Sequence, residues 1–183
     1  MNKHEIRINA KEKRDALPDR GILSRKIGEN LRKVAEFQKA RTVMFYVSFQ
    51  SEVDTRELIH EIILEKKVVV PVVKGKLLEV STITRYDELK GGNFGILEPK
   101  NLHPVLLSEI DCVLVPGIAF DKRGYRIGFG KGYYDRLLKK ISCLKIGLAF
   151  EVQIIEKVPE EPNDVPVDLI VTEKRIIECK NKQ

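Results

Sequence analysis

Apolar positions along this chain alternate between two kinds of spacing, and the alternation predicts the order of its secondary structure. Continuous runs rich in β-branched residues, typical of buried strands, occupy 42–47, 67–73, 111–115 and 145–150. Shorter strand candidates lie at 77–83, 169–172 and 175–179. Between these runs, apolar residues recur every three or four positions, as they do in helices, at 3–17, 55–65, 130–140 and in the stripe Leu23, Ile27, Leu31 and Val34. We therefore expect an α/β fold with a mostly parallel sheet and helices on both faces.

Breaking residues mark where these elements end. Pro18 should end the first helix, because proline cannot continue the backbone hydrogen bonding of a helix interior. Pro71 within a strand run predicts a strand end or a sheet edge, and Asp54-Thr55 can cap the helix that follows. The glycine-rich stretch 91–99 and the proline-rich stretch 159–166 are predicted to be irregular loops.

The size and composition of the chain predict one globular domain over 1–183. A length of 183 residues with 43% hydrophobic content suits a single core, and no repeat, linker or low-complexity segment interrupts it. No apolar stretch approaches membrane-spanning length and the first residues lack an apolar signal core, so we expect a cytoplasmic protein without a membrane partner. The widely spaced Cys112, Cys143 and Cys179 argue against a disulfide framework or a zinc site.

The formal charge of +6 is concentrated at the N-terminal end. Residues 1–41 hold twelve Lys and Arg against six Asp and Glu, whereas the remaining residues hold 21 of each. In the first predicted helix, spacings of three and four place one stripe of cations on one face: Lys3, Arg7, Lys11 and Arg14. Such a stripe is either an ordinary solvated side or a surface for an anion, which could be a nucleic acid or the phosphates of a nucleotide.

A glycine-rich segment, 116–135, runs from a predicted strand into a predicted helix. Glycines let backbone N–H groups approach an anion closely, and connections of this kind hold phosphates in α/β proteins. The spacing Gly128-x-Gly130-x-Gly132 is neither the dinucleotide fingerprint nor a Walker A loop, and a tightly packed turn would explain it equally well. Arg126 and Lys131 can neutralise phosphate oxygens, and Asp135 can bind Mg²⁺.

Four further residues have both a structural and a functional interpretation. Tyr133 and Tyr134 are adjacent, so at most one faces the core squarely and the other can line a cleft and stack on a flat ligand. Glu52 follows a buried strand, where it is exposed, caps a helix, or accepts hydrogen bonds from the N–H groups of a ligand. Asp168 is most simply a surface turn carboxylate. Because ligands bind beyond the carboxyl ends of parallel strands, the Glu52 loop and the glycine-rich segment could face one cleft.

The segment Pro116–Asp135 resembles the hallmark of the 5-formyltetrahydrofolate cyclo-ligase family, also called methenyltetrahydrofolate synthetases. That hallmark reads Pro-Gly-x-x-Phe-Asp, then Gly, then Arg-x-Gly-x-Gly-x-Gly-Tyr-Tyr-Asp. Lys3 and Arg7 match the family's N-terminal Lys-x-x-x-Arg pair, the loop 48–55 looks like the one with its folate-binding glutamate, and 163–168 looks like its C-terminal segment ending in Val-Asp. The resemblance spans nearly the whole chain in order.

The resemblance implies ATP- and Mg²⁺-dependent cyclisation of 5-formyltetrahydrofolate to 5,10-methenyltetrahydrofolate, with release of ADP and phosphate. The formyl oxygen would attack the γ-phosphate, nitrogen 10 would close on the activated carbon, and phosphate would leave. ATP would be bound by Lys3, Arg7, Arg126, Ile127, Gly128, Phe129, Gly130, Lys131, Gly132, Tyr133 and Tyr134. The folate would contact Val47, Glu52, Phe129, Gly130, Lys131, Gly132 and Tyr133.

By the same resemblance, Mg²⁺ would be held by Asp135 and Asp168, and the catalytic residues would be Lys131 and Tyr133. Lys131 would stabilise charge on the transferring phosphoryl group. Some family members have arginine where this chain has Phe129, and others have glycine where it has Lys131. The resemblance gives no role to Lys11, Arg14 or the loop 91–99, although that loop could border the folate cleft.

Two other functions are compatible with these residues. A nucleic-acid-binding protein would use the basic N-terminal helix, although no nucleic-acid motif is present and aromatic residues make up only 7% of the chain. An ATP-dependent kinase or ligase acting on another pterin or small amide would keep the fold and change the substrate. We expect a monomer whose ligands are a folate and ATP, without a nucleic-acid partner.

Overall fold

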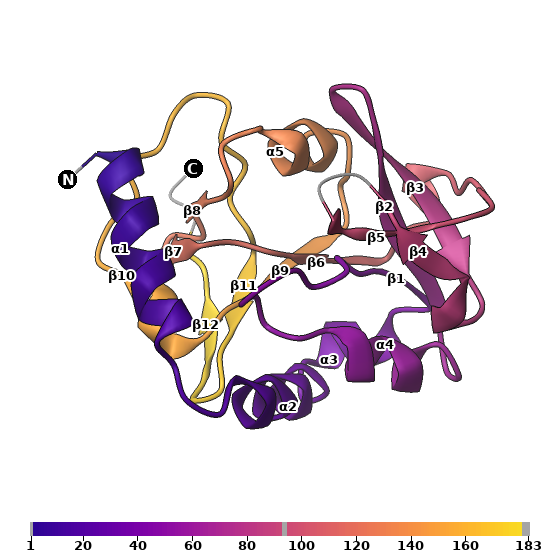
Figure 1. Cartoon of the computed structure of the whole chain (residues 1–183), viewed down its shortest axis with the longest axis horizontal. Helices are drawn as coiled ribbons and strands as arrows, with labels where there is room; N and C mark the ends of the chain where they lie inside the picture. Colours follow the sequence, from indigo (N-terminus) through magenta and orange to yellow (C-terminus); the bar gives the residue numbers. More distant parts are fainter. Residues whose placement is uncertain (1, 93–94, 181–183) are drawn as a thin grey trace.

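A seven-stranded sheet forms the centre of the protein, described here by a computed structural model for residues 2–92 and 95–180. Within these residues the strand order is β12-β11-β9-β6-β1-β2-β3 (Figure 1). The strands are β1 (Thr42–Met44), β2 (Lys67–Lys74), β3 (Leu77–Ile83), β6 (Cys112–Val115), β9 (Leu144–Leu148), β11 (Leu169–Val171) and β12 (Ile176–Glu178). Neighbours from β2 to β11 are parallel, and β3 and β12 are antiparallel at the edges. The predicted, mostly parallel sheet is confirmed.

Helices cover both faces of this sheet, as the sequence predicts. In Figure 1, α2 (Arg20–Leu31), α3 (Ala35–Lys39) and α4 (Arg56–Ile62) lie below the sheet, and α5 (Tyr133–Leu138) lies above it. Successive residues of a strand point to opposite faces, so Leu114 packs in the cluster with α2, α3 and α4, whereas Val113 and Val115 pack in the cluster with α5. Each face of the sheet therefore has its own apolar core.

The N-terminal helix α1 (Lys3–Asp15) packs on a separate, smaller sheet. This sheet has the order β10-β7-β8, formed by β7 (Ala119–Asp121), β8 (Arg126–Ile127) and β10 (Ile154–Ile155). A third cluster of buried side chains joins the two: Ile6 and Ala10 of α1 with Ile118, Ala119, Ile127 and Val158. The small sheet thereby carries α1 to the side of the molecule where the glycine-rich segment begins (Figure 1).

The remaining elements are short. A two-stranded sheet is formed by β4 (Leu89–Gly91) and β5 (Leu97–Pro99), and single 3₁₀ turns form η1 (Tyr86–Glu88), η3 (Leu107–Glu109) and η4 (Glu151–Gln153). The expected irregular loop 91–99 is therefore partly strand, and its positions 93 and 94 lie outside the described residues. The other expected loop, 159–166, contains no helix or strand.

Several element boundaries differ from the prediction for local reasons. The apolar stripe that ends at Val34 is divided, because α2 ends at Leu31 and Val34 immediately precedes α3. The helix predicted from residue 130 begins only at Tyr133, since Gly130 and Gly132 have φ values of 91° and 64°, which a right-handed helix cannot contain. The strands β7, β8 and β10 were not expected from the pattern of apolar residues.

Pro71 lies inside β2, which is not an edge strand. Its position opposite Val80 of β3 is paired, but β1 on the other side ends at Met44, and the last backbone bond toward it joins Phe45 N to Val69 O. At Pro71 the strand therefore has a neighbour on one side only. The missing amide proton costs no sheet hydrogen bond there, so the expectation of an edge holds locally and fails for the strand as a whole.

Candidate active site

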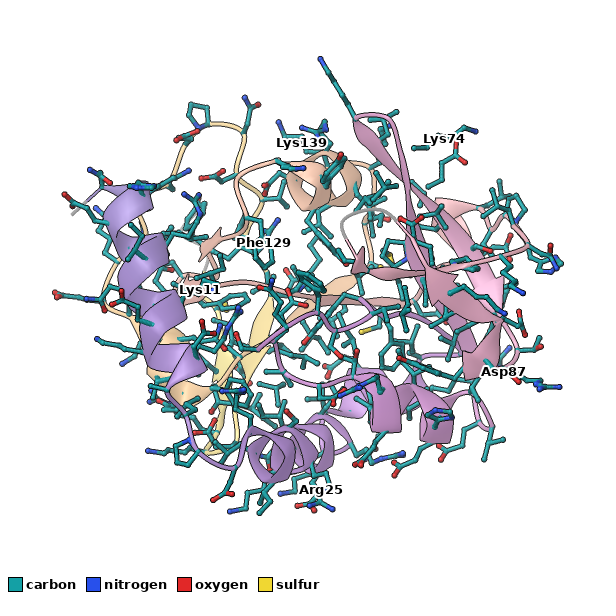
Figure 2. The ribbon with its side chains drawn as sticks, in the orientation of Figure 1. Lys11, Arg25, Lys74, Asp87, Phe129 and Lys139 are labelled. Atoms are coloured by element: carbon teal, nitrogen blue, oxygen red, sulfur yellow. The ribbon has the colours of Figure 1, made fainter. Side chains whose placement is uncertain are left out.

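The loop between β8 and α5 has a backbone conformation that glycine adopts readily and that is unfavourable for other residues. Gly130 and Gly132 have positive φ values, where a side chain is strained. A Cβ at Gly128 would meet nothing within 4 Å, so the backbone borders open space there. Phe129 is 51% exposed, and Lys131 is exposed as well. Figure 2 shows Phe129 beside the end of β8, in the part of the view between α1 and α5.

Two cations of α1 reach this side of the molecule, as predicted. Arg7 Nε donates a hydrogen bond to the carbonyl oxygen of Gly128 at 2.9 Å. Lys3 Nζ pairs with Asp164 Oδ2 at 2.7 Å and Glu161 Oε1 at 3.1 Å. Burial opposes the charge of Lys3, but the hydrogen bonds to the two carboxylates raise its pKa overall. The structure therefore brings the N-terminal pair, the glycine loop and the segment 159–166 together.

Arg126 and Asp135 form an ion pair behind the loop. Arg126 Nη2 donates to Asp135 Oδ1 at 2.8 Å, and Arg126 Nη1 donates to the carbonyl oxygen of Val165 at 2.5 Å. The amide of Val165 donates to the same Asp135 oxygen at 3.2 Å. Burial lowers the pKa of Arg126, while the negative charges of Asp135 and Asp164 raise it. Two carboxylates thus lie near one buried guanidinium.

Asp168 lies elsewhere, at the amino ends of the parallel strands. Its Oδ2 accepts a hydrogen bond from the amide of Lys145, the residue after the first of β9, at 2.8 Å. Asp111 plays the same part before β6, where its Oδ2 accepts from the amides of Arg41 and Thr42, each at 2.8 Å. Among the described residues, no group of three or more His, Cys, Asp and Glu side chains could hold a metal ion. The geometry of Asp168 agrees with its interpretation as a turn carboxylate.

Glu52 occupies the turn after β1, where its carboxylate is largely enclosed. Glu52 Oε2 accepts a hydrogen bond from the amide of Phe49 at 2.9 Å. Burial raises the pKa of Glu52 from 4.5 to about 7, against the opposing effects of the Phe49 amide and the positive charge of Arg14. Burial, and then the charge of Glu52, raise the pKa of Tyr46 and of Tyr134. Glu52 therefore changes its ionisation near neutral pH and lies beside α5, which follows the glycine loop.

The predicted basic stripe of α1 is not a solvated face. Arg14 is 0% exposed, so it does not belong to a surface patch. Lys3 is engaged by acidic side chains, Arg7 by the glycine loop, and Lys11 Nζ by Asp15 Oδ2 at 3.0 Å. Arg14 is thus buried, and Lys3 and Arg7 bond to other segments, whereas Lys11 and Asp15 form a partly exposed pair. The four cations therefore do not form the contiguous cationic surface on which the nucleic-acid interpretation depends.

The adjacent tyrosines face different ways, as their spacing on a helix requires. The Tyr133 hydroxyl donates to the carbonyl oxygen of Gly75 at the tip of the β2–β3 hairpin, at 3.0 Å. Tyr134 packs against both cores of the large sheet, and its buried hydroxyl has no hydrogen-bond partner among the described residues. Val47 and Ile127 are buried in two different apolar clusters. Tyr133 is thus the one of the two tyrosines that reaches the exterior of the core.

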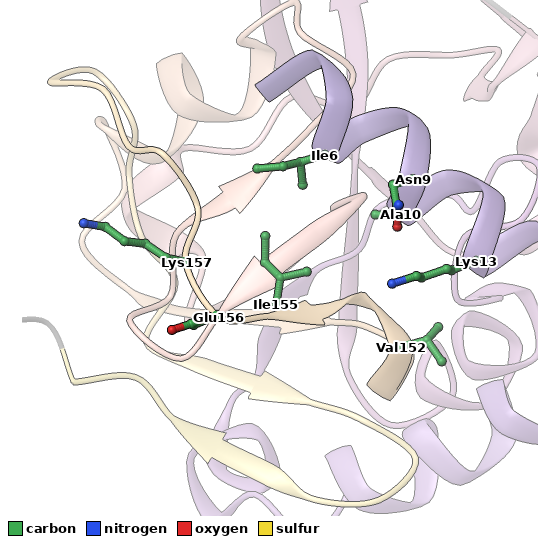
Figure 3. A pocket seen from close by; sticks show the side chains of 8 residues that line it. All are labelled: Ile6, Asn9, Ala10, Lys13, Val152, Ile155, Glu156 and Lys157. Carbon is green, nitrogen blue, oxygen red and sulfur yellow. The ribbon is translucent and has the colours of Figure 1, made fainter. Parts of the chain in front are cut away.

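A hollow of about 310 Å³ lies between α1 and the segment that contains η4 and β10 (Figure 3). It is lined by Ile6, Asn9, Ala10, Lys13, Val152, Ile155, Glu156 and Lys157. None of the predicted site residues lines it, so it is distinct from the proposed ligand cleft. No helix within the described ranges has the length and apolar character needed to cross a membrane.

Residues 1–173 match the 5-formyltetrahydrofolate cyclo-ligase family. The chain belongs to this family. A 5-formyltetrahydrofolate cyclo-ligase of Haemophilus influenzae is 38% identical over 146 residues, covering 74% of this chain and 78% of the relative. The enzyme of the same name from Escherichia coli K12 is 36% identical over 149 residues, covering 76% of this chain and 81% of that one.

Solved structures of the family have the same fold. The NMR structure of Aquifex aeolicus 5,10-methenyltetrahydrofolate synthetase aligns with a TM-score of 0.90 and 39% identity, covering 100% of this chain and 95% of that one. A 5,10-methenyltetrahydrofolate synthetase from Mycoplasma pneumoniae aligns with a TM-score of 0.77 and 27% identity, covering 94% and 99%. The α/β architecture is therefore the family's architecture.

Two residues, Asp164 and Arg14, make contacts with the predicted site segments that the sequence pattern does not predict. Asp164, for which no role is predicted, pairs with Lys3 and lies four positions before Asp168. Arg14 was placed on the basic stripe of α1. Its spacing of four from Ala10, and of eight from Ile6, would have placed it on the apolar side of the helix instead.

Proposed function

We propose that this chain catalyses the ATP- and Mg²⁺-dependent cyclisation of 5-formyltetrahydrofolate to 5,10-methenyltetrahydrofolate, with release of ADP and phosphate. Family membership supports the reaction, and one contact supports the site. Arg7 Nε bonds to the carbonyl oxygen of Gly128, 121 residues away, so a predicted ATP-binding cation lies against the predicted phosphate loop. Glu52 approaches α5, at the end of that loop, through its electrostatic contact with Tyr134.

The ATP phosphates fit the glycine loop. Open space over Gly128 and the left-handed conformations of Gly130 and Gly132 leave backbone amides accessible to anionic oxygens. Lys3, Arg7 and Lys131 would supply the compensating positive charge. Ile127, which is buried, would contribute only its backbone. Arg126, whose side chain bonds to Asp135 and Val165, would act by holding Asp135 in place.

For Mg²⁺ we propose Asp135 together with Asp164, in place of the predicted pair of Asp135 and Asp168. Both residues lie beside Arg126, and the amide next in sequence to Asp164 bonds to Asp135. Two carboxylates fit this ion, because Mg²⁺ in phosphoryl-transfer sites takes one or two carboxylates, several waters and the phosphates of its nucleotide. The ion would neutralise charge on the phosphates during transfer.

The folate would lie between the glycine loop and the turn of Glu52. The ionised carboxylate of Glu52 can accept hydrogen bonds from the N–H groups of a pterin ring, and the exposed ring of Phe129 offers a face on which a flat ligand can stack. Tyr133 would contact the substrate from the start of α5. Val47, which is only 4% exposed and packs in the core beside this turn, would form an apolar wall of the folate site.

The reaction then needs positioning and charge stabilisation more than covalent chemistry by the protein. The formyl oxygen forms a bond to the γ-phosphorus as the bond to ADP breaks. Nitrogen 10 next bonds to the formyl carbon and loses its proton, while the carbon–oxygen bond breaks and phosphate leaves. Lys131 would balance the negative charge on the transferring phosphoryl group.

The test of this function is product formation from 5-formyltetrahydrofolate, ATP and Mg²⁺, followed at the absorbance band of the methenyl product. We expect the wild-type protein to form product only with all three components. Lys131→Ala should lower kcat by about 10²-fold or more, the usual loss for one charge-stabilising group. Lys140→Ala, which removes an exposed lysine after α5, is the matched control and should leave kcat unchanged. Absence of product in the wild type would refute the function.

The metal assignment has its own test. Asp164→Asn should raise the Mg²⁺ concentration needed for half-maximal activity by about tenfold or more, whereas Asp168→Asn should leave it unchanged. Both substitutions preserve shape and remove one charge, so they form a matched pair. The reverse outcome would restore Asp168 as the ligand. The cytoplasmic location and the monomeric state stay predictions.

A further inference from the structure

Arg14 is a fully buried charged residue that the proposed reaction does not use. It is 0% exposed and ranks among the largest completely buried side chains of the described residues. Its Nη2 has no hydrogen-bond partner within them. A charged group is placed in a protein interior at high energetic cost unless its charge is compensated. The location of Arg14 therefore calls for a negatively charged partner.

The hydrogen bonds of Arg14 join three segments that carry the site. Arg14 Nε donates to Ser51 Oγ at 3.0 Å, beside Glu52 in sequence, and Arg14 Nη1 approaches the carbonyl oxygen of Gly117 at 3.4 Å. Ser51 in turn donates to Asp15 of α1. Since Gly117 follows β6 and begins the glycine-rich segment, Arg14 ties α1, the turn of Glu52 and the start of that segment together.

Glu52 is the negative group with the largest effect on the pKa of Arg14. Burial lowers the pKa of Arg14, and the charge of Glu52 is the strongest of the influences that raise it. The groups around Glu52 are Arg14 from α1, Tyr46 following β1, Tyr134 from α5 and the amide of Phe49 in its own turn. Asp15 also acts on Arg14, and Asp54 on Tyr46. Arg20 likewise acts on Arg14, and Arg126 on Tyr134. Among the groups that act on Glu52 itself, Arg14 alone carries positive charge.

We propose that Arg14 is a positioning residue for Glu52: it fixes the turn of Glu52 against α1 and Gly117, and its charge favours the ionised form of the Glu52 carboxylate, which folate binding needs. The proposal rests on the proposed function in one respect only, which is that the ligand of Glu52 is a folate. Its electrostatic part holds for the free protein. The two parts can therefore be tested separately.

The first experiment is an NMR pH titration of the free protein with ¹³C-labelled glutamate, using Glu52→Gln to assign the signal. The wild-type signal of Glu52 should titrate at a pKa of about 7. In Arg14→Gln the midpoint should rise by about one pH unit or more, the effect expected from loss of a nearby opposite charge. Ser51→Ala removes a hydrogen-bond partner of Arg14 but keeps the charge of Arg14. In this variant the midpoint of Glu52 should stay within about half a pH unit of the wild-type value. An unchanged midpoint in Arg14→Gln would overturn the proposal.

Arg14→Lys keeps the test decisive should Arg14→Gln fail to fold. Lysine loses the bonds to Ser51 and Gly117 but retains the charge, so the midpoint of Glu52 should remain within about half a unit of the wild-type value. A larger rise in the lysine variant would mean that geometry alone governs Glu52, and would also overturn the proposal. Circular dichroism of each variant establishes that it is folded.

The second experiment measures kinetics as a function of pH. Arg14→Gln should raise the KM for the folate progressively as the pH falls below the shifted midpoint, whereas the KM for ATP should change less than about twofold. Arg14→Lys should restore the wild-type pH dependence of the KM for the folate, while the lost bonds to Ser51 and Gly117 raise that KM by the same factor at every pH. A merely structural role would raise both KM values at every pH without rescue by lysine. If the wild-type protein forms no product while the titration still shows the shift, the proposed function fails and the link between Arg14 and Glu52 stands.

Discussion

The enclosed carboxylate of Glu52 should cost this protein stability, and replacing it by glutamine should recover that stability in a pH-dependent way. The pKa of Glu52 is raised from 4.5 to about 7 in the folded protein, chiefly by burial. Between these values the folded state binds a proton that the unfolded state has already released. The free energy of unfolding therefore falls as the pH rises through this window, and the full cost is present above pH 7.

The magnitude follows from the two pKa values. One pKa unit corresponds to about 1.4 kcal/mol, so a difference of about 2.5 corresponds to about 3 kcal/mol. Glu52→Gln carries no charge at any pH, and its amide oxygen can still accept the hydrogen bond from Phe49. We expect the variant to be about 2–3 kcal/mol more stable than the wild type at pH 8 and equal to it within about 0.5 kcal/mol at pH 4.

Urea unfolding of both proteins at a series of pH values measures this effect. Titration of every other group is common to the two proteins, so the difference between their free energies of unfolding isolates Glu52. That difference should increase between about pH 4.5 and pH 7 and then level off. A difference that does not depend on pH would show that the carboxylate is solvated like any surface glutamate. The variant should also bind the folate more weakly, because stability and binding place opposite demands on this side chain.

Three further predictions concern the backbone and Tyr133. Gly124→Ala should lower the free energy of unfolding by more than about 3 kcal/mol, because Gly124 has φ 90° and an added Cβ would overlap the carbonyl oxygen of Val167. The control is Gly21→Ala in helix α2, where an added Cβ would meet no atom within 4 Å. This substitution should instead raise the melting temperature, because alanine favours a helix over glycine. Gly130→Ala should cost about 1–2 kcal/mol in thermal unfolding and raise the KM for ATP, and an unchanged KM would contradict the phosphate site. Tyr133→Phe loses the hydrogen bond to Gly75, so it should cost about 1 kcal/mol or less in stability while raising the KM for the folate; an unaffected KM would remove Tyr133 from the site.

The large sheet could be predicted because its parallel strands lie within runs of mostly apolar residues. The strands β6 and β9 are buried on both faces, and such strands consist almost entirely of apolar residues. The hairpin of β7 and β8 leaves no such run, since β8 has two residues. Its turn is held by the buried Asp121, which accepts hydrogen bonds from Arg123 and from the amide of Val158. The bond from Val158 joins segments 37 residues apart in sequence, so no local pattern reveals it.

The site was predictable as a set of motifs and less so as a set of contacts. The resemblance identified Lys3, Arg7 and the glycine loop, and the structure brings Arg7 onto Gly128. It names Asp168 and gives no role to Asp164, whereas the fold places Asp164 against Lys3 and Asp168 against the start of β9. Periodicity showed that cations share one side of α1 but not how that helix is rotated toward its neighbours.

The contacts of α1 also determine when the site can be assembled during protein synthesis. The bonds of α1 reach Gly117, Gly128 and Asp164, which lie 103, 121 and 161 residues further along the chain. Glu52, by contrast, bonds to Phe49, three residues away. As the chain leaves the ribosome, α1 can bond early to Ser51, but its partners Gly117, Gly128 and Asp164 follow only with most of the polypeptide, and ordering such distant contacts is slow. The turn that would receive the folate can form early, whereas the half proposed for ATP exists only once the C-terminal segments have folded back onto the N-terminal helix.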